Sequence, residues 1–226
     1  MDFEFIYENI PLYMEAAKLT ISIAAWGILG SIIIGLLCSM IKELRIPVLR
    51  NIVQFYIELS RNTPLLIQLF FLYFGLPKVG ILLSSEACAI TGLTFLGGSY
   101  MAEAFRAGID NVAQSQRESS YSLGMTRQQT FIHIILPQAV ATAMPAFIAN
   151  VIFLIKETSV FSVVALADLM YVAKDLIGIS YKTDEALLML VVAYLVILLP
   201  ISVIGSWIER RVRYAGFGNR SAVSGD

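Results

Sequence analysis

Charged residues are few in this chain, and neither sign predominates. Of 226 residues only 15% are charged, 58% are hydrophobic, and the formal net charge is −1. A soluble globular domain is typically about a quarter charged and nearly half apolar. The composition therefore favours a membrane protein. The lack of a basic excess argues against nucleic acid as a partner, because such binding needs a strongly basic face.

Residues that commonly hold metals or perform nucleophilic chemistry are also scarce. The two cysteines, Cys38 and Cys88, lie in apolar runs, and His133 is the single histidine. Free cysteines in such runs usually behave as small buried hydrophobic residues, so we expect neither a disulfide nor a metal site. No Ser/His/Asp or Cys/His set is apparent, so we expect no catalytic residue.

A phosphate-binding loop is missing as well. Residues 92–99 are rich in glycine, but Gly98 occupies the position at which such a loop has its lysine. We expect these glycines to let membrane helices approach closely instead. The chain should therefore hold no cofactor and hydrolyse no nucleotide itself. Acidic residues near the N-terminus, Asp2, Glu4 and Glu8, argue against a cleavable signal peptide.

Long apolar segments are what the sequence does contain. A helix needs roughly 20 residues to cross the hydrocarbon core of a bilayer. We expect five such helices with no soluble domain between them, so that residues 1–226 form one all-α, polytopic membrane domain in contact with lipid. The expected spans are residues 19–41, 51–76, 87–105, 137–157 and 186–208.

The positions of lysine and arginine predict the orientation, because these residues accumulate on the cytoplasmic side. One set of polar segments carries Lys42, Arg45, Arg50, Arg106, Arg117, Arg127, Arg210, Arg211, Arg213 and Arg220. The opposite set carries only Lys18, Lys78, Lys174 and Lys182. We therefore expect the N-terminus outside and the C-terminus in the cytoplasm.

Residues 115–137 form a polar island on the expected cytoplasmic side. Ser115 with Glu118, and Thr126 with Gln129, each have the spacing of a capping box at a helix N-terminus. Gly124 lies between them, where a left-handed turn would need glycine. We expect two short helices joined by a sharp turn, the second giving way to the next segment at Pro137. The island is either a passive connector or a docking element for another protein.

Some of the expected spans contain charged residues, which cost about 2.5–3.5 kcal/mol at a helix centre and so need a reason. Glu58 and Arg61 are three residues apart and can pair on one face, and we expect Asn62 and Gln68 on the same stripe. Pro64 should loosen the backbone after Arg61. Two readings stay open. These charges are structural, as an ion pair that locks two helices or as side chains that reach the nearby cytoplasmic end, or they line a polar pocket.

A polar pocket with these residues would suit a ligand that carries both a carboxylate and an ammonium group. In the fourth span Asn150 and Glu157 are seven residues apart and share a face, with Lys156 beside them. Arg61 can offer two parallel N–H groups to a carboxylate, and Glu157 can accept an ammonium group.

Several motifs bear a family resemblance. Glu118, Gly124, Ile134, Leu136 and Pro137 have the spacing of the Glu-Ala-Ala-x3-Gly-x9-Ile-x-Leu-Pro signature of ABC importer permeases. Segments 60–68, 105–112 and 156–159 are similar to motifs of the polar amino acid subgroup, and the similarity extends from about Leu12 to Gly218. The chain departs from the pattern at the two alanines of the signature, which are Ser119 and Ser120, and at Ala107 and 113–115.

The resemblance implies the ABC type I importer permease fold in a bacterial cytoplasmic membrane. It implies a cytoplasmic coupling loop over about 109–136 that docks on two copies of an ATP-binding subunit, which would hold ATP and Mg. It also implies a second permease chain, identical or related, and an extracytoplasmic amino-acid-binding protein. The implied coupling residues are Glu118, Ser119, Ser120, Gly124, Thr126, Arg127, Ile134, Leu136 and Pro137. The implied substrate-binding residues are Glu58, Arg61, Asn62, Thr63, Gln68, Asn150, Lys156, Glu157, Thr158 and Ser159.

Two other classes of protein stay open from the residues alone. An ion-coupled secondary transporter would work without an ATPase, and it usually shows inverted repeats, which we do not find in the sequence. A membrane scaffold would recruit a cytosolic partner through the same loop but carry no solute.

Overall fold

The computed structural model describes residues 1–44 and 47–212, and within these ranges it contains helices and no strand. Three basic residues used above to predict the orientation lie outside the described residues: Arg45, Arg213 and Arg220. The same holds for the last residues of the segment that resembles the permease family, 213–218. The α-helices are α1 (Phe3–Glu43), α2 (Leu49–Arg61), α3 (Leu65–Phe70), α4 (Ser85–Asp110), α5 (Gln114–Ser122), α6 (Arg127–Thr130), α7 (Leu136–Glu157), α8 (Leu169–Ser180) and α9 (Thr183–Val212). Shorter π and 3-10 turns occupy Phe71–Gly75, Leu76–Val79, Phe131–Ile135 and Thr158–Val164.

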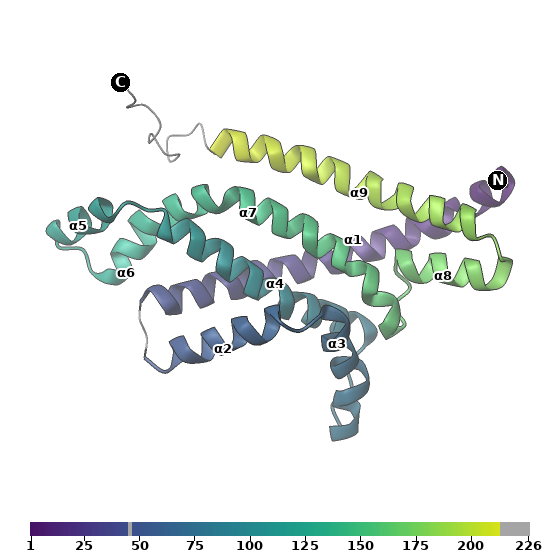
Figure 1. Ribbon diagram of the computed structural model, residues 1–226, viewed down its shortest axis with the longest axis horizontal. Helices are drawn as coiled ribbons and strands as arrows, with labels where there is room; N and C mark the ends of the chain where they lie inside the picture. Colours follow the sequence, from purple (N-terminus) through teal and green to yellow (C-terminus); the bar gives the residue numbers. More distant parts are fainter. Residues whose placement is uncertain (45–46, 213–226) are drawn as a thin grey trace.

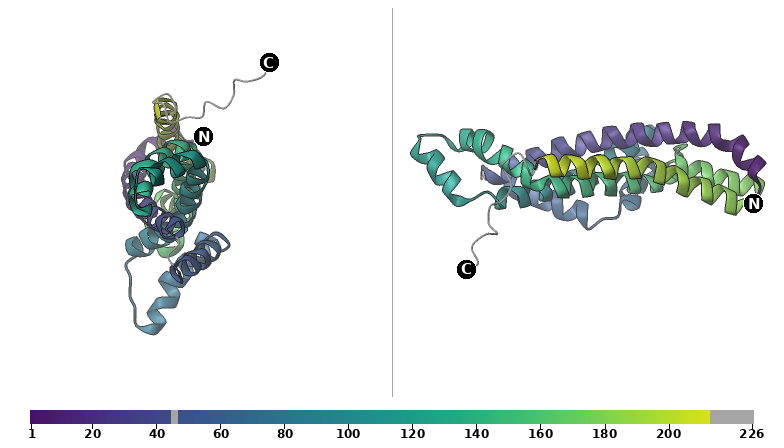
Figure 2. Two further views of the ribbon diagram at one scale, coloured as in Figure 1. Left: turned by 90° about the vertical axis from the view of Figure 1, so that its left-hand side faces the viewer. Right: turned by 90° about the horizontal axis from the view of Figure 1, so that it is seen from above.

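The long helices α1, α4, α7 and α9 run side by side and give an elongated bundle (Figures 1 and 2). The short helices α5 and α6 lie at one end of the bundle, and the N-terminus and α8 lie at the other. Helix α9 ends near the α5–α6 end (Figure 1). The polar island and the last described residues therefore share one end, opposite the N-terminus, which is the relative arrangement that the lysine and arginine pattern predicts.

Three predicted spans lie in segments long and apolar enough to cross a membrane: Phe3–Glu43, Arg127–Val164 and Thr183–Val212. Helix α4 is 26 residues long and contains the predicted span 87–105, but it also carries charged residues near both ends. Large apolar side chains such as Trp26, Leu199 and Val203 remain exposed, as expected for surfaces that face lipid.

The predicted span 51–76 is not one continuous helix. Helix α2 ends at Arg61, Pro64 caps a new helix with an extended backbone, and α3 begins at Leu65. Proline disfavours the helical conformation of the residue before it, which explains why the chain breaks here and not only loosens. Helix α3 then leaves the direction of α2 and projects from the bundle (Figures 1 and 2).

Helix α8 was not expected from the sequence. It starts at an N-cap, Asp168, whose carboxylate accepts hydrogen bonds from the backbone N–H groups of Met170 and Tyr171. Asp168 is itself fully buried. An aspartate ahead of an apolar run is a helix-start signal, and this signal could have located α8.

Contacts near the N-terminus join α1 to the start of α9. The Tyr13 hydroxyl donates a buried 2.7 Å hydrogen bond to the Ala186 carbonyl, and the Lys182 ammonium lies 2.7 Å from an Asp2 carboxylate oxygen. The hydrogen bond from Lys182 lowers the pKa of the Asp2 carboxyl group below its usual value. These bonds fix the start of α9 beside the N-terminus.

Small residues let α1, α4 and α7 pack closely, as predicted for the glycine-rich segment 92–99. The Ser31 hydroxyl of α1 lies between helices and donates to the carbonyls of Gly27 and Leu93, at 2.7 and 3.3 Å. Gly97 sits directly against Ser31, where a Cβ atom would overlap the hydroxyl. Hydrogen bonds of this kind supply specificity between membrane helices.

Gly108 marks the closest approach of α4 to α7, because a Cβ there would overlap the backbone carbonyl oxygen of Ala139. We expect Gly108→Ala to lower the free energy of unfolding by about 1–3 kcal/mol, the usual cost of overpacking. The matched control is Gly178→Ala, since Gly178 of α8 has no atom within 4 Å of an added Cβ. Thermal unfolding in detergent measures both, and equal stability of the two variants would contradict the prediction.

Candidate functional site

One face of α2 is polar, although the helix belongs to an apolar protein. Arg50, Gln54, Glu58 and Arg61 recur at helical spacing and are exposed, while Val53 and Ile57 face the protein and are buried. This four- and three-residue periodicity is visible in the sequence. It could have identified Arg50 and Gln54 as candidate site residues, which were missed because only the charges inside expected spans were considered.

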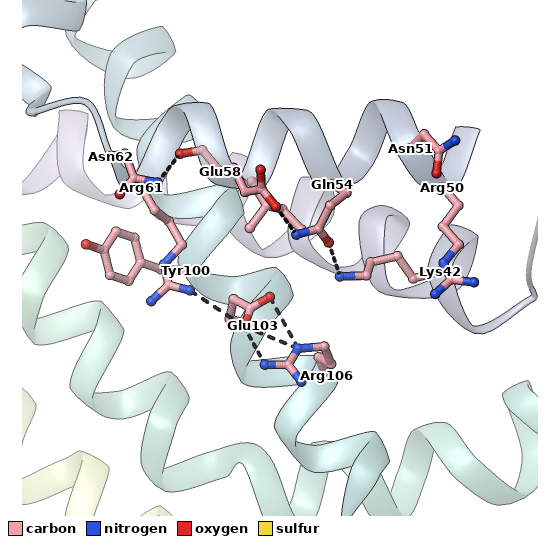
Figure 3. A pocket seen from close by; sticks show the side chains of 11 residues that line it. Lys42, Arg50, Asn51, Gln54, Glu58, Arg61, Asn62, Tyr100, Glu103 and Arg106 are labelled. Carbon is pink, nitrogen blue, oxygen red and sulfur yellow. Dashed lines mark hydrogen bonds and ion pairs between the residues drawn. The ribbon is translucent and has the colours of Figure 1, made fainter. Parts of the chain in front are cut away.

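The polar face of α2 borders a cavity of about 810 Å³. Figure 3 shows the cavity between α2 and α4, with side chains of both helices pointing into it. Three of the predicted substrate-binding residues, Glu58, Arg61 and Asn62, contribute to its lining. The complete lining is Lys42, Arg50, Asn51, Gln54, Ile57, Glu58, Arg61, Asn62, Tyr100, Glu103 and Arg106.

Arg61 is oriented by α4. Its guanidinium lies 3.6 Å from a Glu103 carboxylate oxygen and 5.4 Å from the centre of the Tyr100 ring (Figure 3). Of the two readings left open above, the described structure shows no Glu58–Arg61 ion pair, and both residues line the cavity. Arg61 is the last residue of α2, and a partner on the facing helix is within reach of its long side chain. The Arg61 side chain is 44% exposed, so it can still reach a ligand in the cavity.

Two hydrogen-bonded groups of side chains line the rest of the cavity. Lys42 donates to the Gln54 amide oxygen at 2.9 Å, and the Gln54 amide donates to Glu58 at 2.6 Å. On α4, Arg106 donates to Glu103 at 2.7 Å (Figure 3). Four cationic side chains, Lys42, Arg50, Arg61 and Arg106, thus face two carboxylates, Glu58 and Glu103. Their unequal number gives the lining an excess of positive charge.

Thr63 and Gln68 lie elsewhere. Both line a second, mostly apolar cavity of about 410 Å³ between α2, α3 and α4. The helix break after Arg61 removes the shared stripe predicted for Asn62 and Gln68. Gln68 is buried, and its amide nitrogen donates to the carbonyls of Ser60 and Thr63 at 3.2 and 3.0 Å. In the described structure Gln68 therefore ties α3 to the end of α2.

The predicted residues of α7 and the following turn lie outside the lining of the polar cavity. Asn150 donates to the Tyr100 carbonyl at 3.2 Å and so joins α7 to α4. Thr158 is fully buried, and its hydroxyl lies 3.3 Å from that of Tyr194 on α9. Glu157 is not among the residues that line the polar cavity with Arg61. The remaining residues of this group, Lys156 and Ser159, lie beside Glu157 and Thr158.

The polar island folds as two short helices, α5 and α6, joined at Gly124. Gly124 has φ +80°, a left-handed conformation that favours glycine. The capping box of Thr126 and Gln129 is confirmed, with both reciprocal hydrogen bonds present at 3.3 and 2.9 Å. The predicted Ser115–Glu118 box is wrong, because α5 begins at Gln114 after an Ala113 cap and Ser115 lies inside the helix.

The second short helix does not end at Pro137. A π-turn over Phe131–Ile135 joins α6 directly to α7, and Pro137 lies in the first turn of α7. Proline is tolerated in the first turn of an α-helix because the N–H group that it lacks would have no α-helical acceptor there. The island is therefore continuous with a long helix of the bundle. It is not a separate helical hairpin.

Most of the implied coupling residues are at the surface, and two groups anchor the island. The exposed ones are Glu118, Ser119, Gly124, Thr126, Arg127 and Pro137. Two others, Ile134 and Leu136, are partly buried. Ser120 is buried, and its hydroxyl lies 3.0 Å from that of Thr130, so it joins α5 to α6. Beneath them, Ile109, Val112, Phe131, Ile135 and Ala139 form an apolar cluster that also contacts Met40, Leu44 and Leu136.

Comparisons with known proteins agree with this arrangement. Residues 27–214 match the family "Binding-protein-dependent transport system inner membrane component". The chain is 35% identical to the "Probable amino-acid ABC transporter permease protein PatM" of Vibrio harveyi, covering 95% of this chain and 97% of that one. It is 30% identical to the "Glutamine transport system permease protein GlnP" of Escherichia coli K12, covering 94% and 98%.

A solved structure supports the same assignment. The fold superimposes on a crystal structure of an amino acid ABC transporter with histidines, with a TM-score of 0.86 and 30% sequence identity. The superposition covers 93% of this chain and 99% of that one. The chain therefore belongs to the family of binding-protein-dependent transport system inner membrane components, and it is the membrane-spanning permease subunit of an amino acid ABC importer.

Proposed function

We propose that this permease carries a polar amino acid along a path that includes the polar cavity between α2 and α4. The observation that supports this most is the cavity itself, because side chains of both charges line about 810 Å³ in a protein with few charges. A zwitterionic substrate needs partners of both signs to leave water without a large desolvation cost. Arg61 is the proposed carboxylate ligand, since its guanidinium is held by Glu103 and Tyr100 yet partly exposed.

The charge of the lining favours some amino acids over others. The names of the similar proteins mention glutamine, arginine and histidines, so they do not select one substrate. Four cations against two carboxylates in the cavity disfavour a substrate that brings another positive charge. We therefore propose a substrate with a neutral or acidic polar side chain, not lysine or arginine. The other residues implied to bind substrate would act on the path beyond this cavity. They are Thr63, Gln68, Asn150, Lys156, Glu157, Thr158 and Ser159.

The α5–α6 loop is the proposed docking element for the motor. As a permease of an ABC importer, the chain works with ATP-binding subunits and a second permease. We propose two copies of the ATP-binding subunit, which hold ATP and Mg. Each copy would contact the exposed loop around Gly124 of one permease chain. The polar face of α2 is open in the single chain, which fits a second permease, identical or related, closing the path. An extracytoplasmic amino-acid-binding protein would deliver the substrate.

The proposed orientation follows from the same geometry. The protein lies in the cytoplasmic membrane, as its family does. ATP-binding subunits are cytosolic, so the end of the bundle with α5 and α6 faces the cytoplasm and the N-terminus lies outside (Figure 1). The basic residues near the ends of α1 and α9, Lys42, Arg210 and Arg211, then lie on the cytoplasmic side.

Reconstitution tests the proposal and separates it from the two alternatives. The permease is purified with its interacting proteins and placed in liposomes, and uptake of an amino acid panel is measured with and without ATP. We expect ATP-dependent uptake, with neutral and acidic polar amino acids competing at least about tenfold better than lysine or arginine. ATP-independent, ion-driven uptake would indicate a secondary transporter. Copurification of a partner without any uptake would indicate a scaffold.

A further inference from the structure

The last turn of α1 contacts the α5–α6 loop on one side and the polar cavity on the other. Two consecutive residues make these contacts. Glu43 forms an ion pair with Arg117 of α5, and Lys42 donates to Gln54 of α2 across the cavity at 2.9 Å. Helix α1 ends at Glu43, and the α2 helix that borders the cavity begins at Leu49.

The ion pair between Glu43 and Arg117 joins segments 74 residues apart in the sequence. Both side chains are largely covered, with 24% and 18% exposed, so solvent screens the pair less than a surface pair. The Arg117 guanidinium also donates to the Ile109 carbonyl at 3.4 Å. It therefore connects the start of the loop, α5 and α1.

Apolar packing reinforces this junction. Met40 and Leu44 lie on either side of Glu43 in the sequence, and both contact the apolar cluster beneath the loop. A small cavity of about 240 Å³ beside the pair is lined by Glu43, Arg117 and Arg127, among others. Glu43 and these two arginines therefore border one cavity. A cation at position 43 would lose the ion pair with Arg117 and add a third positive charge to this lining.

The contact on the cavity side continues along α2. Gln54, which accepts from Lys42, donates in turn to Glu58 at 2.6 Å. A displacement of the α1 end would therefore move or break a chain of hydrogen bonds that includes two residues of the cavity lining on α2. Chains of hydrogen bonds and packed side chains of this kind can carry coupling energy between distant sites.

We propose that the Glu43–Arg117 ion pair couples the α5–α6 loop to the polar cavity, with the last turn of α1 as the connecting element. This inference rests on the proposed function of the loop and the cavity. Glu43 and Arg117 act as positioning residues, because they hold the α1 end to the loop and need not contact the substrate. Movement of the docked loop would then reach α2 through Lys42 and Gln54, in addition to its direct path through α4 and α7.

Charge reversal tests the proposal in the reconstituted complex. Glu43→Arg and Arg117→Glu are made singly and together, and uptake per ATP hydrolysed is measured. We expect each single variant to lower this ratio roughly two- to thirtyfold, the range of known coupling effects, and the double variant to recover most of it. The control is the reversal of Glu15 and Lys18, an exposed ion pair of 2.6 Å near the other end of α1. Its single variants should leave the ratio unchanged.

The outcomes distinguish this inference from the proposed function. If the wild type shows ATP-driven uptake but both single reversals keep the wild-type ratio, the ion pair has no coupling role. If the double variant is no better than the worse single variant, the pair does not act as a unit. The neutral variant Glu43→Gln separates loss of coupling from misfolding. If it assembles in the same amount as the wild type but has a lower uptake per ATP hydrolysed, the result still supports coupling. Wild-type liposomes without ATP-driven uptake would instead overturn the proposed function.

Discussion

Replacing Arg61 with alanine is expected to reduce uptake roughly ten- to hundredfold, while the complex still assembles and hydrolyses ATP. Hydrogen bonds to charged groups typically contribute about 1.5–3 kcal/mol, which is the basis of this range. Arg61 is the cation of the cavity that α4 positions, through Glu103 and the Tyr100 ring. The measurement is substrate uptake and ATPase activity in the same liposomes.

Arg61→Lys is the matched control for the geometry of this site. Lysine keeps the charge but lacks the planar pair of N–H groups that can bind both oxygens of a carboxylate. We expect an intermediate uptake rate for this variant. Unchanged uptake by Arg61→Ala would remove Arg61 from the substrate path and leave its contacts with Glu103 and Tyr100 as purely structural ones.

The second large effect is expected at Gly124. Gly124→Asp should lose ATP-coupled uptake by on the order of a hundredfold, while the chain still inserts in the membrane. The residue has φ +80°, and apart from its two chain neighbours no described residue has an atom within 4 Å of an added Cβ. An aspartate there causes no clash within the permease, but it places an unpaired carboxylate at the proposed contact with the ATP-binding subunit. An unpaired charge buried at an interface costs several kcal/mol.

Gly124→Asn separates the charge from the backbone. Asparagine has almost the same size and, like aspartate, tolerates the left-handed conformation better than most residues. We expect this variant to retain much more uptake and to copurify with the ATP-binding subunit. The docking role of the loop would be refuted by full uptake in Gly124→Asp, or by copurification equal to that of the wild type.

Local patterns in the sequence predicted local structure well. The capping box of Thr126 and Gln129 was confirmed because both bonds join residues three apart, so the sequence contains the whole motif. The predicted span 137–157 agrees with α7, which runs from Leu136 to Glu157, because the apolar run ends in charged residues. The first capping box failed because the helix began earlier, at Gln114, and helix starts depend on the preceding backbone as well as on spacing.

Contacts between distant segments were decided by the tertiary structure. A pairing of Arg61 with Glu58 on its own helix was one of two readings of the sequence, yet Arg61 lies against Glu103, 42 positions further along the chain. Only the crossing of α2 and α4 brings these groups together. The same holds for Arg117, whose partner Glu43 is 74 residues away.

The sequence by itself determined that this chain is an all-helical membrane protein, where three of its long apolar segments lie, and to which transporter family it belongs. These properties follow from apolar run length, helix-start spacing and a contiguous signature, all of which are local. The tertiary structure alone decided which charged side chains line the cavity and that the end of α1 joins it to the α5–α6 loop. The reason is that ion pairs between helices depend on crossing positions and side-chain reach, which no short stretch of sequence contains.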